Sequence, residues 1–68
     1  ALEMAEKIGD LRGQAVELYN IACIHRNKKK HAKAIIKYMK AQSLYRQLGL
    51  ADMVQQIQKN IDKIKKNP

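Results

Sequence analysis

Apolar residues recur along most of this chain at intervals of three and four, which is the spacing of one face of an α-helix. Two stripes show this most clearly. Their members are Ala34, Tyr38, Ala41 and Tyr45 in the first, and Val54, Ile57, Ile61 and Ile64 in the second. No run alternates apolar and polar residues as a half-buried strand would. The pattern therefore predicts an all-α fold.

The same pattern divides the chain into four helical stretches. They are Leu2 to Ile8, Leu11 to Asn27, His31 to Leu48 and Ala51 to Lys66. Gly9 and Gly49 suit the position after a helix end, and Asp10 could cap the helix that follows. The first stretch is too short to be a stable helix by itself, so we interpret it as the end of a longer helix. The third stretch is widened by Ile35, Met39 and Leu44, which we expect to face the core.

A weak internal repeat, called the internal echo below, predicts the domain organisation. Ile8 and Gly9 return about 40 residues later as Leu48 and Gly49, and the pair at 20–21 returns at 60–61. Repetition at a fixed interval of this size is typical of stacked helical hairpins. We predict one domain over 1–68: residues 1–9 end a preceding helix, 10–49 form one helix-turn-helix repeat, and 50–68 form a capping helix with a polar back. Fewer than two repeats suggest a piece of a longer array.

Seven positions together resemble the tetratricopeptide repeat, in its longer variant of about 40 to 42 residues. They are Leu18, Ile21, Ala22, His25, Ala34, Tyr38 and Ala41. The resemblance implies a right-handed solenoid of antiparallel helices, in which small residues such as Ala22 let the helix backbones approach closely. The chain departs from the family at His25, where an aromatic residue is usual, and at Lys29, where the corner usually has glycine. The closing proline of the shorter repeat is also absent.

In that family the first helix of each hairpin lines a concave surface that holds partner peptides. The residues of this helix that the packing pattern does not use are Val16, Tyr19, Asn20, Cys23, Arg26 and Asn27. An Asn20 amide can both donate to and accept from a peptide backbone, and Arg26 could pair with a carboxylate through a forked contact. The alternative is that Tyr19 and Asn20 only pack against a neighbouring repeat. Tyr19 and Cys23 also replace the Lys and Asn of the family's carboxylate clamp, so that clamp is not supported.

Charge is the second strong feature, with a formal net charge of +8. A basic patch without any acidic residue lies in the middle of the chain. It contains Lys28, Lys29, Lys30, Lys33, Lys37 and Lys40, next to Arg26. We interpret the stretch at 26–31 first as a solvated corner between two helices, since basic residues suit a helix C-terminus. The alternative function is nucleic-acid binding, although no aromatic residues alternate with the lysines to stack on bases.

The remaining chemistry is sparse. Cys23 and His25 are two positions apart and point away from each other on a helix, so we expect no metal site and no cofactor. No base and acid can be paired with Cys23 as a nucleophile, and the sequence has neither a glycine-rich phosphate loop nor a suitably spaced carboxylate pair, so we expect no enzymatic activity. A single cysteine favours a reducing, cytoplasmic setting. No apolar run is long enough to cross a membrane, and the basic face lacks a free apolar partner face, so we expect no membrane contact.

The sequence thus predicts a protein–protein interaction module, a scaffold or adaptor, whose peptide or helical partner is acidic. Self-association could bury the open end of the stack. That end consists of Leu2, Met4, Ala5 and Ile8.

Overall fold

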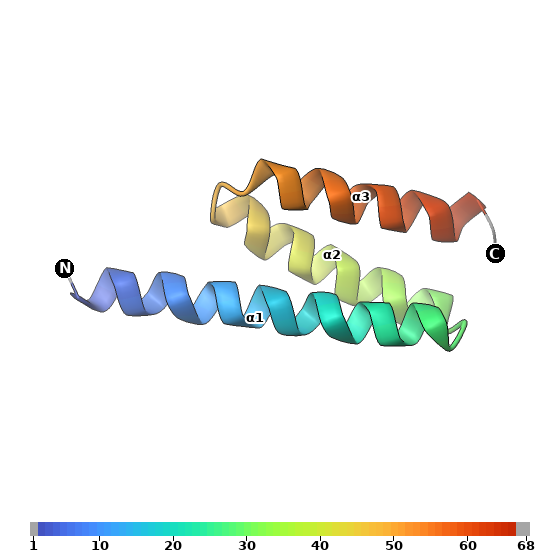
Figure 1. Ribbon diagram of the computed structural model, residues 1–68, viewed down its shortest axis with the longest axis horizontal. Helices are drawn as coiled ribbons and strands as arrows, with labels where there is room; N and C mark the ends of the chain where they lie inside the picture. Colours follow the sequence, from blue (N-terminus) through green and yellow to red (C-terminus); the bar gives the residue numbers. More distant parts are fainter. Residues whose placement is uncertain (1, 67–68) are drawn as a thin grey trace.

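One long helix and two shorter ones follow each other along the chain, each antiparallel to the one before (Figure 1). The computed structural model describes residues 2–66, and the side chains of residues 7–66. The helices are α1 (Leu2–Asn27), α2 (His31–Gln47) and α3 (Ala51–Lys66). The central helix α2 packs against both neighbours, whereas α1 and α3 contact each other far less. Residues 2–66 contain no strand, so the prediction of an all-α fold is confirmed.

The first helix is longer than predicted. α1 runs without a break through Gly9 and Asp10, so the predicted helix end at Gly9 and the cap at Asp10 are wrong. Gly9 does not adopt the left-handed conformation of a helix end. It lies inside α1 instead, since glycine also tolerates helical dihedrals, at a cost of about 1 kcal/mol relative to alanine. The predicted boundary between residues 1–9 and 10–49 therefore falls inside a helix. The start of α1 projects past the turn between α2 and α3 (Figure 1).

The basic stretch at 26–31 is the corner between α1 and α2, as predicted. α1 ends at Asn27 and α2 begins at His31. Lys29 occupies the left-handed region with φ of 60°. Its N–H donates to the Arg26 carbonyl at 3.0 Å, and the Lys30 N–H donates to the His25 carbonyl at 2.8 Å. This hydrogen-bond pair is the Schellman motif, which satisfies carbonyls that the helix end leaves unpaired.

The corner between α2 and α3 repeats the same motif. Gly49 has φ of 74° and donates its N–H to the Arg46 carbonyl at 3.1 Å, while Leu50 donates to the Tyr45 carbonyl at 3.0 Å. Leu50 also packs against the core, as the residue two after the cap often does. The predicted helix end near Gly49 is therefore confirmed.

The core combines alanines of α1 and α2 with two tyrosines of α2 and three isoleucines of α3. Its buried members are Ala15, Ala22, Ala34, Tyr38, Ala41, Tyr45, Ile57, Ile61 and Ile64. Ala22, Ala34 and Ala41 are completely buried, which confirms that they lie where the helices pack closely. Met39 was predicted to widen the core stripe of α2, and that prediction is wrong, because its side chain is 57% exposed on the outer side of the helix.

A buried amide joins α2 to α3. The Gln42 side chain is almost fully buried, and its Nε2 donates to the Val54 carbonyl at 3.1 Å and to Gln58 Oε1 at 2.9 Å. Both amide hydrogens are thus used, as burial of a polar group requires. The pattern of apolar residues could not reveal this link, because a glutamine at the edge of a helical stripe usually faces solvent.

Candidate partner-binding surface

The six predicted partner-binding residues lie along one strip of α1. The exposed members are Val16, Asn20 and Asn27, and the partly buried members are Tyr19, Cys23 and Arg26. Successive members are three or four positions apart, or are direct neighbours, so they follow the same side of the helix. The strip, called the α1 strip below, therefore offers both solvent-facing and anchored side chains.

The anchored members of the strip are held by the core tyrosine of α2. The Tyr19 ring meets the Tyr38 ring edge to face, with 5.8 Å between the ring centroids and an angle of 69°. The Cys23 Sγ lies 3.3 Å from the Tyr38 hydroxyl oxygen, within hydrogen-bond distance. Burial of the phenol, followed by this contact with Cys23, raises the pKa of Tyr38 far above its ordinary value. Tyr38 stays neutral and fixes the floor beneath Tyr19 and Cys23.

At its C-terminal end the strip continues onto α3. Arg26 Nη1 donates a hydrogen bond to Asn60 Oδ1 at 3.2 Å. This contact holds the guanidinium between the first and third helices, which otherwise contact each other little. Asn60 was not predicted as a site residue, although it is the counterpart of Asn20 in the internal echo. That echo was the available signal for a second helix in the site.

The basic patch occupies the corner and the outer side of α2. Lys28, Lys29 and Lys30 are exposed at the corner. Along α2, Lys33 and Lys40 are exposed and Lys37 is partly buried. The six lysines therefore lie at the corner and along α2, whereas the residues of the α1 strip belong to α1.

The surroundings of His25 show that several of these lysines lie near one another. Its side chain is partly buried, and its Nδ1 atom is shielded from solvent without a hydrogen-bond partner. Desolvation lowers the pKa of His25 below its ordinary value, and the nearby charges of Lys30, Lys33, Lys28 and Lys37 lower it further. The His25 imidazole thus faces the basic patch from α1 and takes up a proton less readily than an ordinary histidine.

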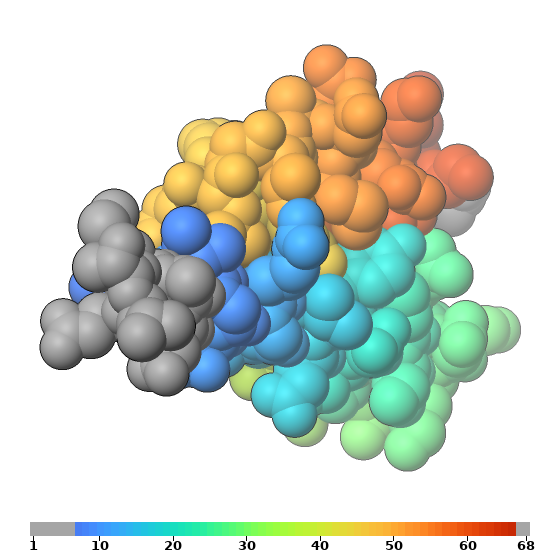
Figure 2. All heavy atoms as spheres, turned by 60° about the vertical axis from the view of Figure 1, so that its left-hand side comes forward, coloured from blue at the N-terminus to red at the C-terminus, as the bar shows by residue number. Residues whose placement is uncertain are grey.

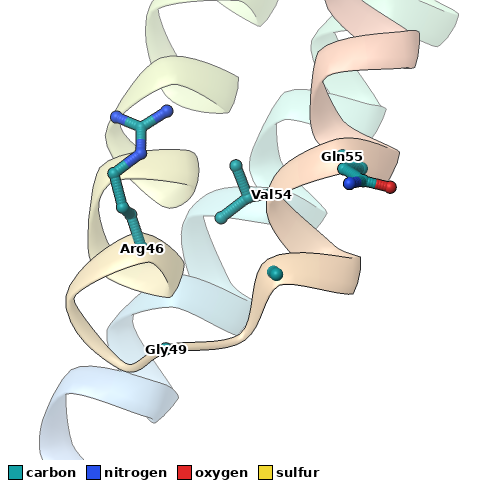
Figure 3. Close-up of a pocket in the computed structure, with 5 residues that line it drawn as sticks. Arg46, Gly49, Val54 and Gln55 are labelled. Atoms are coloured by element: carbon teal, nitrogen blue, oxygen red, sulfur yellow. The ribbon is translucent and has the colours of Figure 1, made fainter.

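A shallow pocket lies where α2 turns into α3 (Figure 3). Its volume is about 260 Å³, and it is lined by Arg46, Gly49, Ala51, Val54 and Gln55. Figure 3 shows Val54 between the two helices, with Arg46 extending along α2 beside it. Sequence reasoning missed this grouping, since Arg46 looks like an ordinary basic residue in the last turn of a helix.

Neither a metal site nor a membrane span is found over the part of the chain that the structure describes. No three His, Cys, Asp or Glu side chains gather there as metal ligands would. Within the same residues, no helix combines the length and the apolar character needed to cross a bilayer.

Comparisons of the chain with protein-family models, with curated proteins and with solved structures found no match. What the chain binds must therefore be inferred from the placement and the chemistry of its own side chains.

Proposed function

We propose that this chain is a tetratricopeptide-like interaction module that binds an acidic peptide or helix along the α1 strip. The observation that carries the proposal is that all six predicted residues share one side of α1. Arg26 then extends that surface to α3 through Asn60. A surface shared by two helices can hold an extended ligand in one orientation, which a single helix side does poorly.

The chemistry of the strip suits a carboxylate-bearing ligand. A guanidinium carries five N–H donors, so the hydrogen bond to Asn60 leaves Arg26 with donors for a carboxylate. That hydrogen bond also restricts the side chain in advance, which lowers the entropy lost on binding. Asn20 is exposed for contact with a peptide backbone, and Val16 offers an apolar contact beside it.

The packing of the helices supports the proposed solenoid. Buried alanines on α1 and α2 allow the close approach of a repeat hairpin, and the outward side of α3 is formed mainly by Gln, Lys and Asp. A polar outer side suits a helix that closes a stack. On α1, Ile24 is 52% exposed, and such a surface suits a further hairpin or a second copy. Of the residues proposed for self-association, Ile8 is half-exposed, and the side chains of Leu2, Met4 and Ala5 lie outside the described residues.

A displayed peptide library provides the test. We expect selection on the chain to enrich peptides rich in Asp and Glu. In calorimetric titrations with the best peptide, Arg26→Gln should weaken binding by about tenfold or more, since a hydrogen bond to a charged group contributes about 1.5–3 kcal/mol. Asn20→Ala should weaken it less. The control is the Lys33→Gln, Lys37→Gln double variant, which should bind the peptide nearly as well as the unchanged chain.

The result that would overturn the proposal is the reverse pattern. If the lysine variant abolishes peptide binding while Arg26→Gln and Asn20→Ala leave it unchanged, the α1 strip is not the binding surface. Circular dichroism of each variant will show that the helices are intact.

Nucleic-acid binding is the second candidate, and it is favoured by the absence of any acidic residue between Glu17 and Asp52. The tyrosines weaken it, because Tyr38 and Tyr45 are buried and Tyr19 packs on Tyr38, so they are not free to stack on bases. Duplex DNA binding would fall with salt by roughly 0.9 log units per log unit of salt for each phosphate neutralised. A fluorescence-anisotropy titration at two salt concentrations measures this slope.

A further inference from the structure

The outer side of α2 carries two large apolar side chains that are open to solvent. Ile36 is 52% exposed and Met39 is 57% exposed. They are three positions apart, so they project from the same side of the helix. That side faces away from the buried stripe of Ala34, Tyr38 and Ala41. The central helix is therefore apolar toward the core and apolar again at the centre of its outer side.

Lysines flank these two side chains. Lys33 precedes Ile36 by three positions and Lys40 follows it by four, so both are its neighbours on the helix surface. Lys28, Lys29 and Lys30 extend the positive region beyond the start of α2. No acidic residue lies anywhere on α2 or on this corner to neutralise them. The surface thus combines exposed apolar groups with an unbalanced positive charge.

We propose that this outer face of α2 is a peripheral binding site for an anionic lipid membrane. Clustered lysines are attracted to the negative surface potential of such a membrane, and apolar side chains beside them can enter the boundary between headgroups and acyl chains. The sequence led us to expect no membrane contact, because the basic face lacked an apolar partner face. Ile36 and Met39 supply that partner face, since Met39 lies on the outer side of α2 and not in the core.

The shape of this face favours a membrane over a peptide. The pocket of Figure 3 and two further hollows lie at the α2–α3 turn and along α3, and none of them is lined by Ile36, Met39 or the flanking lysines. An exposed helix side away from these three hollows suits a broad, fluid partner better than a side chain that needs a pocket. Lysine also acts as a point charge without a fixed fork geometry, which suits mobile lipid headgroups.

Vesicle co-sedimentation of the whole chain tests the proposal. We expect binding to phosphatidylcholine vesicles that contain phosphatidylserine, little binding to pure phosphatidylcholine, and a loss of binding as salt is raised. The double variant Lys33→Gln, Lys40→Gln should weaken binding by about fivefold for each lysine removed. The double variant Ile36→Ser, Met39→Ser should weaken binding while leaving the charge unchanged.

A matched control removes the same charge from α3. Lys59 and Lys63 are exposed on α3, whose exposed residues include no large apolar side chain. The Lys59→Gln, Lys63→Gln variant should bind the anionic vesicles much more tightly than the α2 lysine variant. All substituted positions are exposed, and circular dichroism will show that each variant keeps its helices.

Two outcomes would overturn the proposal. Equal losses in the two lysine variants would mean that net charge alone draws the chain to the vesicles. The second outcome combines two results: the Ile36→Ser, Met39→Ser variant binds vesicles as well as the unchanged chain, and the chain binds duplex DNA through the same lysines. That outcome would identify a phosphate-binding surface for nucleic acid instead. Neither outcome affects peptide binding at Arg26 and Asn20, so the failure of this proposal and that of the proposed function are distinguishable.

Discussion

α1 and α3 both pack on α2, but the buried side chains that they contribute differ in size. Over residues 7–27 the buried residues of α1 are Ala15 and Ala22, whereas those of α3 are Ile57, Ile61 and Ile64. Alanine leaves room for the backbones and the tyrosines of α2 to come close. Isoleucine instead fills the space between more separated surfaces. The central helix thus packs against completely buried alanines of α1, with Leu18 and Tyr19 partly buried beside them, and against buried isoleucines of α3.

The two helices also differ on their outer sides. α1 exposes large apolar side chains, with Ile8, Val16, Ile21 and Ile24 among them, and none of the large apolar residues of α3 is exposed over Ala51–Lys66. Figure 2 shows α1 and α3 on one side of the molecule. Over residues 51–66, α3 therefore exposes no large apolar side chain, while α1 retains a surface that suits a further contact.

The largest effect should follow from shortening a buried isoleucine of α3. Ile57→Ala removes a completely buried side chain, and such changes cost about 2–5 kcal/mol. A single core of this size supplies little more than that, so we expect the variant to be largely unfolded. Urea unfolding followed by circular dichroism measures the loss. Ile36→Ala is the matched control, because Ile36 is half-exposed, and a loss as large as that of Ile57→Ala would contradict the role assigned to the α3 isoleucines.

The next effect should come from enlarging an alanine of α1. Ala22→Leu inserts a bulky side chain where the alanine is completely buried, and overpacking costs about 1–3 kcal/mol. Thermal unfolding will report the change as a lower midpoint. The exposed Ala32 on α2 provides the control, since Ala32→Leu should change the midpoint little. Equal midpoints for Ala22→Leu and the unchanged chain would mean that close approach is not what alanine provides.

Substitutions at the two corners, which join α1 and α3 to α2, should change the free energy of unfolding in opposite directions. Gly49→Ala places a side chain at φ of 74° with nothing near its Cβ, so backbone strain alone should cost about 1–2 kcal/mol. Lys29→Gly removes a side chain from φ of 60° and should stabilise the chain by up to about 1 kcal/mol. Denaturant midpoints of the two variants measure both changes, and a destabilised Lys29→Gly variant would show that the lysine side chain itself stabilises the corner.

A smaller effect concerns the pH dependence of stability. Because the pKa of His25 is lowered by burial and by Lys30, Lys33, Lys28 and Lys37, the folded chain binds this proton less readily than the unfolded chain. The contribution is complete above the unfolded pKa of about 6.5 and is lost as pH falls below it. We expect urea midpoints to decline between pH values of about 7.5 and about 5. His25→Gln should reduce the decline, and His31→Gln, the control, should keep it.

The smallest effect should come from the outer side of α1. Ile24→Gln changes a side chain that is already half in solvent, so the free energy of unfolding should shift by no more than about 0.5 kcal/mol. If the exposed face of α1 mediates self-association, the variant should also be more monomeric in sedimentation equilibrium. A loss of several kcal/mol would mean that Ile24 is covered in solution.

Repetition and spacing predicted most of the helices. The start of α2 at His31 and the whole span of α3 follow from apolar stripes bounded by Gly49 and by the basic corner. The buried alanines followed from the same spacing, because a small residue that recurs among larger ones at helical intervals marks a place where two helices approach closely. These features depend on residues that are close together in the sequence, so the spacing of residue types is enough to predict them.

Contacts between helices were harder to predict. The Gln42 amide and the Arg26–Asn60 hydrogen bond join residues far apart in the chain, and nothing in the composition of either segment marks the pair. Met39 was misplaced because it directly follows the core residue Tyr38 in the sequence, although one residue step turns about 100° around a helix and takes Met39 to the outer side, where it is 57% exposed. Gly9 was misread because glycine tolerates both a helix interior and a helix end.

The hydrogen bond from Arg26 to Asn60 offers a way to detect a ligand bound to the α1 strip. Arg26 is restrained in this way only while α3 stays docked, so a ligand held by that guanidinium will prefer the docked population. By mass action it should then slow amide-proton exchange along residues 51–66, although most of its contacts are on the first helix. The C-terminal helix would serve as a built-in reporter of a distant binding event.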